Sequence, residues 1–98
     1  MLQQKIDELK DRYTITTKTK EQCFTKMNTA RFEHVKADRQ YGENDIRTAV
    51  ALQEYEKFYT LWDKLDNLQN ALYEAINYLV DAQIALDNVN KYGEDLLK

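Results

Sequence analysis

The chain has 98 residues, of which 43% are hydrophobic and 32% charged, with no proline and two glycines, a composition typical of helical proteins rather than disordered ones. A domain of this size buries only about 60 to 65% of its unfolded surface, so we expect residues 1–98 to form one helical domain that gains stability as a homo-oligomer. The net charge of −3 argues against nonspecific binding to nucleic acid.

The two parts of the chain carry opposite charge. Residues 1–42 have a net charge of +3 and residues 43–98 a net charge of −6. Opposite signs favour packing of the two segments against each other. Exposed ion pairs contribute only ~0 to 1 kcal/mol each and are screened by salt, so the charge pattern predicts orientation more than stability.

Cysteine content and hydropathy indicate the cellular compartment in which the protein is expected. A single cysteine, Cys23, excludes an internal disulfide framework and a cysteine-rich zinc site. The first residues lack the apolar core of a signal peptide, and the longest apolar run, 49–52, is too short to cross a bilayer. We therefore expect a cytoplasmic protein that does not associate with membranes.

A repeat of three and four residues predicts a first helix over residues 2–41. The positions on its inward face are Leu2, Ile6, Leu9, Tyr13, Thr16, Lys20, Cys23, Met27, Ala30, His34, Ala37 and Tyr41. Several β-branched residues between 14 and 19 weaken the helical pattern, and the repeat turns polar there. A bend, or a break with a restart at about Lys20, is therefore an open alternative.

The strongest turn signal lies at residues 42–45. Gly42 suits the left-handed backbone that often follows the end of a helix, and Asn44 or Asp45 suits the N-cap of the next one. Because the turn is short, the two flanking helices should be antiparallel neighbours.

A second helix is predicted over residues 46–92, because no glycine or proline interrupts this stretch. At 1.5 Å per residue it would be about 65 to 70 Å long, and Gly93 is expected to end it. The alternative is a break near Asn67, which would give a three-helix bundle.

The second predicted helix carries a core stripe with heptad spacing. Its large members are Phe58, Leu61, Leu65, Leu68, Leu72, Leu79, Leu86 and Val89. Trp62, Ile76 and Val80 widen the stripe beyond what contact with one other helix requires. The wide stripe therefore favours a bundle formed with a second copy or a partner.

The sequence lacks the motifs of known catalytic chemistry. It contains no serine, no glycine-rich phosphate loop and no Cys–His pair at a suggestive spacing. We interpret His34, with Glu33 and Asp38 nearby, as a partly buried or surface histidine, since metal sites in bundles draw ligands from several helices. Cys23 is interpreted as a small core residue. We expect no enzymatic activity, no cofactor and no metal.

Basic residues gather on the first predicted helix. They are Lys18, Lys20, Lys26, Arg31, Lys36 and Arg39. Such a side could contact phosphate, but Glu21, Glu33 and Asp38 interrupt it. A solvated face, or a mate for the acidic second helix, is the simpler interpretation. We do not expect nucleic-acid binding and keep it only as an alternative.

Four aromatic residues, Tyr55, Phe58, Tyr59 and Trp62, fall within an arc of about 100° on the second predicted helix. Aromatic rings at helical spacing usually pack in a core, here against Phe24, Met27 and Phe32. Alternatively, Tyr55, Tyr59 and Trp62 form a protein interface, because their rings combine large contact area with a polar tip. The core interpretation is favoured, and both stay open.

These patterns predict an all-α fold, an antiparallel hairpin of two long coiled-coil-like helices that assembles into a bundle. The predicted function is that of a non-enzymatic protein–protein interaction module, an adaptor, assembly factor or inhibitor. A short motif-free chain of this composition would fit an accessory protein of a virus or a mobile element. A structural component of a larger assembly and a nucleic-acid-associated helical protein are the alternative functions. The identity of the partner does not follow from the sequence.

Overall fold

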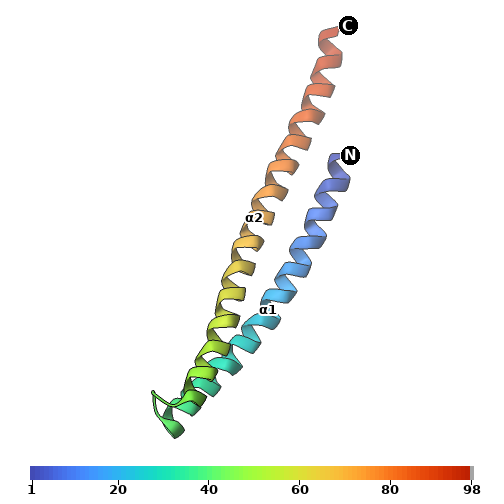
Figure 1. Cartoon of the computed structure of the whole chain (residues 1–98). Helices are drawn as coiled ribbons and strands as arrows, with labels where there is room; N and C mark the ends of the chain where they lie inside the picture. Colours follow the sequence, from blue (N-terminus) through green and yellow to red (C-terminus); the bar gives the residue numbers. More distant parts are fainter. Residues whose placement is uncertain (98) are drawn as a thin grey trace.

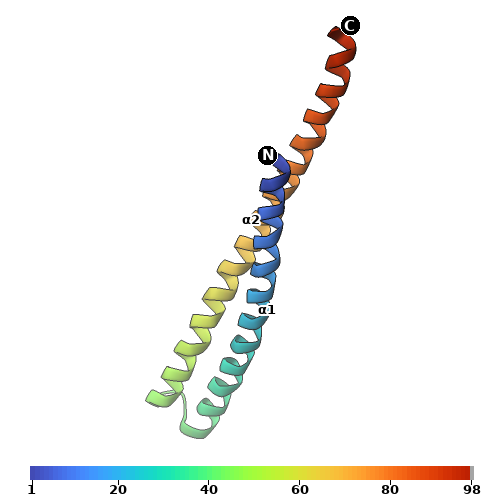
Figure 2. The same cartoon turned by 90° about the vertical axis from the view of Figure 1, so that its right-hand side faces the viewer.

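The computed structural model of the chain is a hairpin of two long helices (Figure 1). It describes the backbone of residues 1–97 and the side chains of residues 1–93 and 96. Helix α1 spans Leu2–Tyr41 and helix α2 spans Ile46–Leu97. The molecule measures 82 × 17 × 14 Å, and both ends of the chain lie away from the turn (Figure 2). The predicted helical hairpin is confirmed.

The three-helix alternative is wrong, because α2 passes through residue 67 without a break. Neither described helix has a stretch long and apolar enough to cross a membrane.

Helix α1 also continues without a break through the threonine-rich segment. Thr14, Thr16, Thr17 and Thr19 each donate a side-chain hydrogen bond to the carbonyl four residues earlier, at 2.7 to 3.1 Å. Their hydroxyl groups are thus satisfied within the helix, which continues despite their weak helix propensity. Thr16 is buried and faces α2. The alternative of a broken first helix is therefore wrong.

The turn between the helices has the features that its residues predict. Gly42 has a positive φ of 88°, and its amide donates to the carbonyl of Asp38 at 2.9 Å. Its carbonyl accepts a 2.7 Å hydrogen bond from the hydroxyl of Thr48, which is buried. Asp45 is the N-cap of α2, since its Oδ1 accepts the backbone N–H of Arg47 at 2.8 Å.

The cap carboxylate also binds the guanidinium of Arg47, at 3.0 and 3.1 Å. These side-chain bonds, together with the backbone N–H bond, hold the pKa of Asp45 below its ordinary value, and the contact raises the pKa of Arg47. Asp45 therefore stabilises the fold when it is ionised, and this stabilisation is lost as the pH falls through its lowered pKa.

We expect Asp45→Ala to lower the melting temperature at neutral pH, because it removes the cap of α2. The difference from the wild type should shrink as the pH falls below about 4, the ordinary pKa of an aspartate, and through the lowered pKa of Asp45 in the folded state. Thermal unfolding followed by circular dichroism over a pH series measures both effects. Asp45→Asn keeps a cap acceptor without charge, so it should show a smaller loss at neutral pH. A gap between wild type and Asp45→Ala that does not change with pH would contradict the argument.

The contact between the helices has heptad spacing on both sides. The inward positions of α1, from Leu2 to Ala37, are all buried or half-buried, as their spacing predicts. On α2 the inward positions form two adjacent rows, of which one contains Ala51, Phe58, Leu65, Leu72 and Leu79. The other row contains Thr48, Tyr55, Trp62, Gln69 and Ile76. Helix α1 therefore packs on a face of α2 that is part apolar and part polar.

Helix α2 does not end at Gly93, as the sequence suggested, but continues to Leu97. A glycine that ends a helix usually takes a positive φ, and among the described residues only Gly42 does so. Gly93 keeps helical geometry, at a cost of about 1 kcal/mol relative to alanine. The predicted end of the helix at residue 92 is therefore wrong.

Candidate functional site

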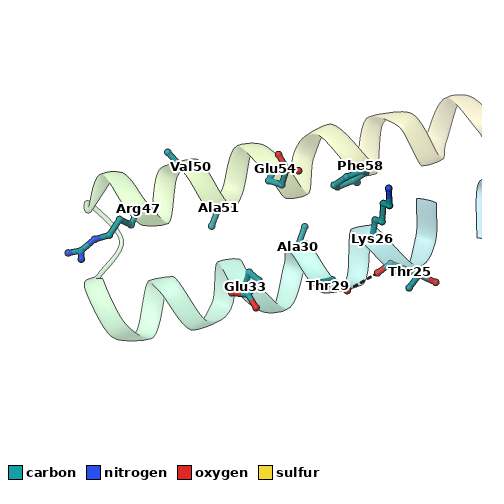
Figure 3. Close-up of a pocket in the computed structure, with 10 residues that line it drawn as sticks. All are labelled: Thr25, Lys26, Thr29, Ala30, Glu33, Arg47, Val50, Ala51, Glu54 and Phe58. Atoms are coloured by element: carbon teal, nitrogen blue, oxygen red, sulfur yellow. Dashed lines mark hydrogen bonds between the residues drawn. The ribbon is translucent and has the colours of Figure 1, made fainter. Parts of the chain in front are cut away.

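An open groove of about 520 Å³ lies between α1 and α2 close to the hairpin turn (Figure 3). Ala30 of α1 points toward α2 and Ala51 of α2 points toward α1, and Val50 and Phe58 of α2 line the groove further. Because alanine side chains are small, they leave room for the larger side chains of another helix to enter between the two. The groove is therefore shaped to receive apolar side chains.

Charged side chains border the groove on both helices, namely Lys26, Glu33, Arg47 and Glu54. Figure 3 shows Arg47 turned away from the groove toward the turn, where its guanidinium carbon lies 3.5 Å from the ring centre of Tyr41. The remaining rim has one cation and two anions.

The groove continues along α2 as a row of exposed leucines. Leu61 and Leu68 follow Glu54 at intervals of seven residues, so they lie on the same side of α2 as the groove. Their exposed fractions are 43% and 47%. We call the groove together with Leu61 and Leu68 the groove side of the hairpin. Its apolar side chains form a strip that α1 covers only in part and that Glu54 interrupts.

A polar cluster explains why α1 packs beside this leucine row rather than on it. The ammonium of Lys20 donates to Asp66 at 2.5 Å and to the side-chain oxygen of Gln69 at 3.1 Å. The amide nitrogen of Gln69 donates to the hydroxyl of Thr17 at 2.8 Å. Lys20 and Thr17 thus have hydrogen-bond partners on α2, in addition to the bond of Thr17 within α1. Lys20 pairs with an acidic residue of α2, as the interpretation of the basic residues as a mate for the second helix expects, and it is not part of an exposed basic side.

The predicted aromatic interface is divided between contact with α1 and solvent. Trp62 is half-buried, with its ring 6.5 Å from that of Phe24 and 5.0 Å from the ammonium of Lys20. Tyr55 is half-buried too, whereas Tyr59 is 51% exposed and stacks at 6.2 Å on Tyr55. Trp62 therefore belongs to the contact between the helices, and Tyr59 is the ring that remains accessible.

The expected packing of these rings on α1 is only partly present. Phe24 meets Trp62 and Met27 is buried, but Phe32 is 69% exposed and takes no part in the core. Tyr59 and Leu61 are two residues apart, or about 200° around a helix, so Tyr59 faces away from the groove side.

The predicted core stripe divides into two sets. Phe58, Leu65, Leu72 and Leu79 are half-buried against α1. The exposed set consists of Leu61, Leu68, Leu86 and Val89. A single chain therefore covers one half of the stripe. Burial of the other half requires a further helix and stays a prediction.

The remaining candidate residues lie apart from the groove. Cys23 is 4% exposed, and its Sγ lies 3.3 Å from the carbonyl oxygen of Phe58, so the thiol is held inside the hairpin. His34 is half-buried on the inward face of α1. Within the described part of the chain, no three His, Cys, Asp or Glu side chains gather as a metal site would require.

Sequence reasoning missed the groove itself. Its residues Ala30 and Ala51 lie on the inward faces of the two helices, and small residues at inward positions near the turn were the available signal. Because their meeting in one groove depends on the register of the hairpin, neither helix reveals it alone. Comparison with known protein families, curated proteins and solved structures finds no match to this chain.

Proposed function

We propose that the chain is a non-enzymatic protein–protein interaction module that binds a helix of a partner protein along its groove side. The observation that supports this proposal is the partly uncovered apolar strip formed by the groove, Leu61 and Leu68. Amphipathic helices bind such grooves by inserting apolar residues spaced three and four apart. An adaptor, an assembly factor or an inhibitor would all use the strip in this way.

The dimensions of the strip fit one further helix. From Val50 to Leu68 the strip extends over about 27 Å of α2, the length of roughly five helical turns. Ala30 and Ala51 allow a close approach of the bound helix next to the turn. Such a helix would lie between α1 and α2 and would complete a bundle.

Val50→Asp tests the proposal, because Val50 lines the groove and is 60% exposed. The variant should fold normally and weaken binding of the partner about tenfold or more, since it places a charge in the apolar contact. The experiment is affinity capture of proteins from lysate, followed by titration calorimetry with the purified partner.

Leu52→Asp is the matched control. It introduces the same charge two residues away, on the opposite side of α2, and should leave binding unchanged. Equal binding by the wild type and Val50→Asp would contradict the groove as the binding site.

The two alternative functions predict different results. A nucleic-acid-associated protein would bind DNA or RNA with an affinity that falls steeply with salt. A structural component would form large assemblies by itself, which mass measurement in solution would detect.

A further inference from the structure

The last part of α2 lies beside no described residue of α1. The ring centres of Tyr13 and Tyr73 lie 6.4 Å apart, and Lys20 contacts Asp66. Moving seven residues along α1 thus corresponds to moving seven residues back along α2. If this register continues to the start of α1, Leu2 lies opposite about residue 84. From about residue 85 to residue 97, helix α2 extends beyond α1 for about 20 Å (Figures 1 and 2). We call this segment the overhang.

The overhang carries its own apolar stripe. Leu86, Val89, Gly93 and Leu96 follow one another at intervals of three, four and three residues. The exposed fractions of Leu86, Val89 and Leu96 are 46%, 66% and 88%. An isolated helix of this length is only marginally stable in water. The stripe therefore indicates that a second helix covers the overhang.

We propose that the overhang pairs with the overhang of a second copy of this chain, in antiparallel orientation about a two-fold axis. The interval pattern of three, four and three is the same in both directions. Leu86 then meets Leu96 of the second copy, and Val89 meets Gly93 of the second copy. Every contact occurs twice, as a two-fold interface requires.

Packing favours this orientation over a parallel one. Antiparallel pairing places the side chain of Val89 over the space at Gly93, where the local helix backbone is the only described part of the chain close to the point that a Cβ would occupy. Parallel pairing would place glycine opposite glycine and leave a cavity. The flanking positions of the stripe, Gln83, Ala85, Asn90 and Tyr92, are uncharged. No like-charge repulsion therefore opposes the pairing.

The position of α1 also excludes the parallel arrangement. Leu79 lies seven residues before Leu86 on the same line of α2, and it is half-buried against α1. A helix that packs on Leu86 therefore continues the line of α1. A parallel copy would bring its own α2 into the space that α1 occupies, whereas an antiparallel copy extends away from it.

The pairing produces a long rod with one hairpin turn at each end. Both groove sides stay free, so the rod could hold two partner helices far apart, and the pairing itself does not depend on the proposed function. The interface would bury roughly 800 Å² in total, which is below the range of standard specific interfaces and in the size class of weak, transient contacts. We therefore expect a reversible dimer with a dissociation constant in the micromolar range.

Small-angle scattering and sedimentation over a concentration series test the shape of the dimer. The radius of gyration should rise from 22.8 Å for the single chain toward about 40 Å for the rod. Leu86→Asp should abolish the rise, while Asn88→Asp, which adds the same charge beside the stripe, should retain it. A chain that stays monomeric at about 0.5 mM, or a dimer with a radius near that of the single chain, would overturn the proposal.

Disulfide trapping tests the orientation. In a Cys23→Ala background, Val89→Cys and Gly93→Cys are oxidised in a glutathione buffer, separately and as an equimolar mixture, and the products are identified by mass spectrometry. Antiparallel pairing predicts that the mixed disulfide between the two variants accumulates above either homodimer. Dominant Val89→Cys homodimers would show a parallel pair and overturn the proposal, as would a failure of the mixture to form the mixed disulfide.

Discussion

Leu72→Asp is expected to destabilise the hairpin by about 3 kcal/mol, a large part of the total stability of a domain of this size. Leu72 lies in the row of α2 that faces α1, so the new carboxylate would be placed against the inward face of α1 without a partner. Circular dichroism at low protein concentration, with heat or urea as denaturant, measures the loss. Low concentration keeps the measurement on the single chain.

Two other aspartate variants serve as controls for this result. Leu68→Asp should cost less than about 0.5 kcal/mol in the single chain, because Leu68 is 47% exposed on the groove side. Asn70→Asp, at an exposed position between the two leucines, should also be nearly neutral. If Leu68→Asp lowered the stability as much as Leu72→Asp, this would mean that α1 packs on the row of Leu61 and Leu68 rather than beside it.

The first helix and the turn follow from local chemistry, and so they could be predicted. The repeat of α1 from Leu2 to Ala37 depends only on helical periodicity, and all its positions are at least half-buried. Gly42 and Asp45 supply a positive φ and a capping carboxylate, which are properties of single residues. These predictions do not require knowledge of how α2 packs against α1.

The face that α2 turns toward α1 could not be predicted in the same way. Its widest apolar stripe spans two rows, and hydrophobicity alone favours burying both Leu65 and Leu68. The structure instead buries the row of Gln69, because Lys20 and Thr17 on α1 require polar partners. Which row of α2 faces α1 depends on the register between the helices, and the register cannot be read from the sequence of either helix alone.

The candidate site shares this dependence on register. The groove brings together Ala30 and Ala51 from the two helices, and the overhang exists because α2 extends beyond the described start of α1. Gly93 was misleading for a different reason. A glycine near the end of a helix either terminates it or continues it, and only the backbone conformation distinguishes the two cases.

Trp62→Ala should lower the free energy of unfolding by about 2 to 4 kcal/mol. The half-buried indole contacts Phe24 of α1 and lies 5.0 Å from the ammonium of Lys20, so truncation removes packing between the helices and a cation–π contact. Urea unfolding followed by circular dichroism measures the loss, since the variant no longer has tryptophan fluorescence. A loss below about 1 kcal/mol would show that Trp62 is a surface residue.

Tyr59→Ala is the matched variant on the exposed side of the same aromatic patch. It should change stability by less than about 1 kcal/mol, because Tyr59 is 51% exposed and stacks only on its neighbour Tyr55. Its effect on the binding of a captured partner then shows whether the partner binds the groove side or the side of Tyr59. Since Tyr59 faces away from the groove side, we expect binding to persist in Tyr59→Ala and to weaken in Val50→Asp. The reverse result would move the binding site to Tyr55 and Tyr59, where Tyr59 would act as the anchor and Trp62 would support it from the contact between the helices.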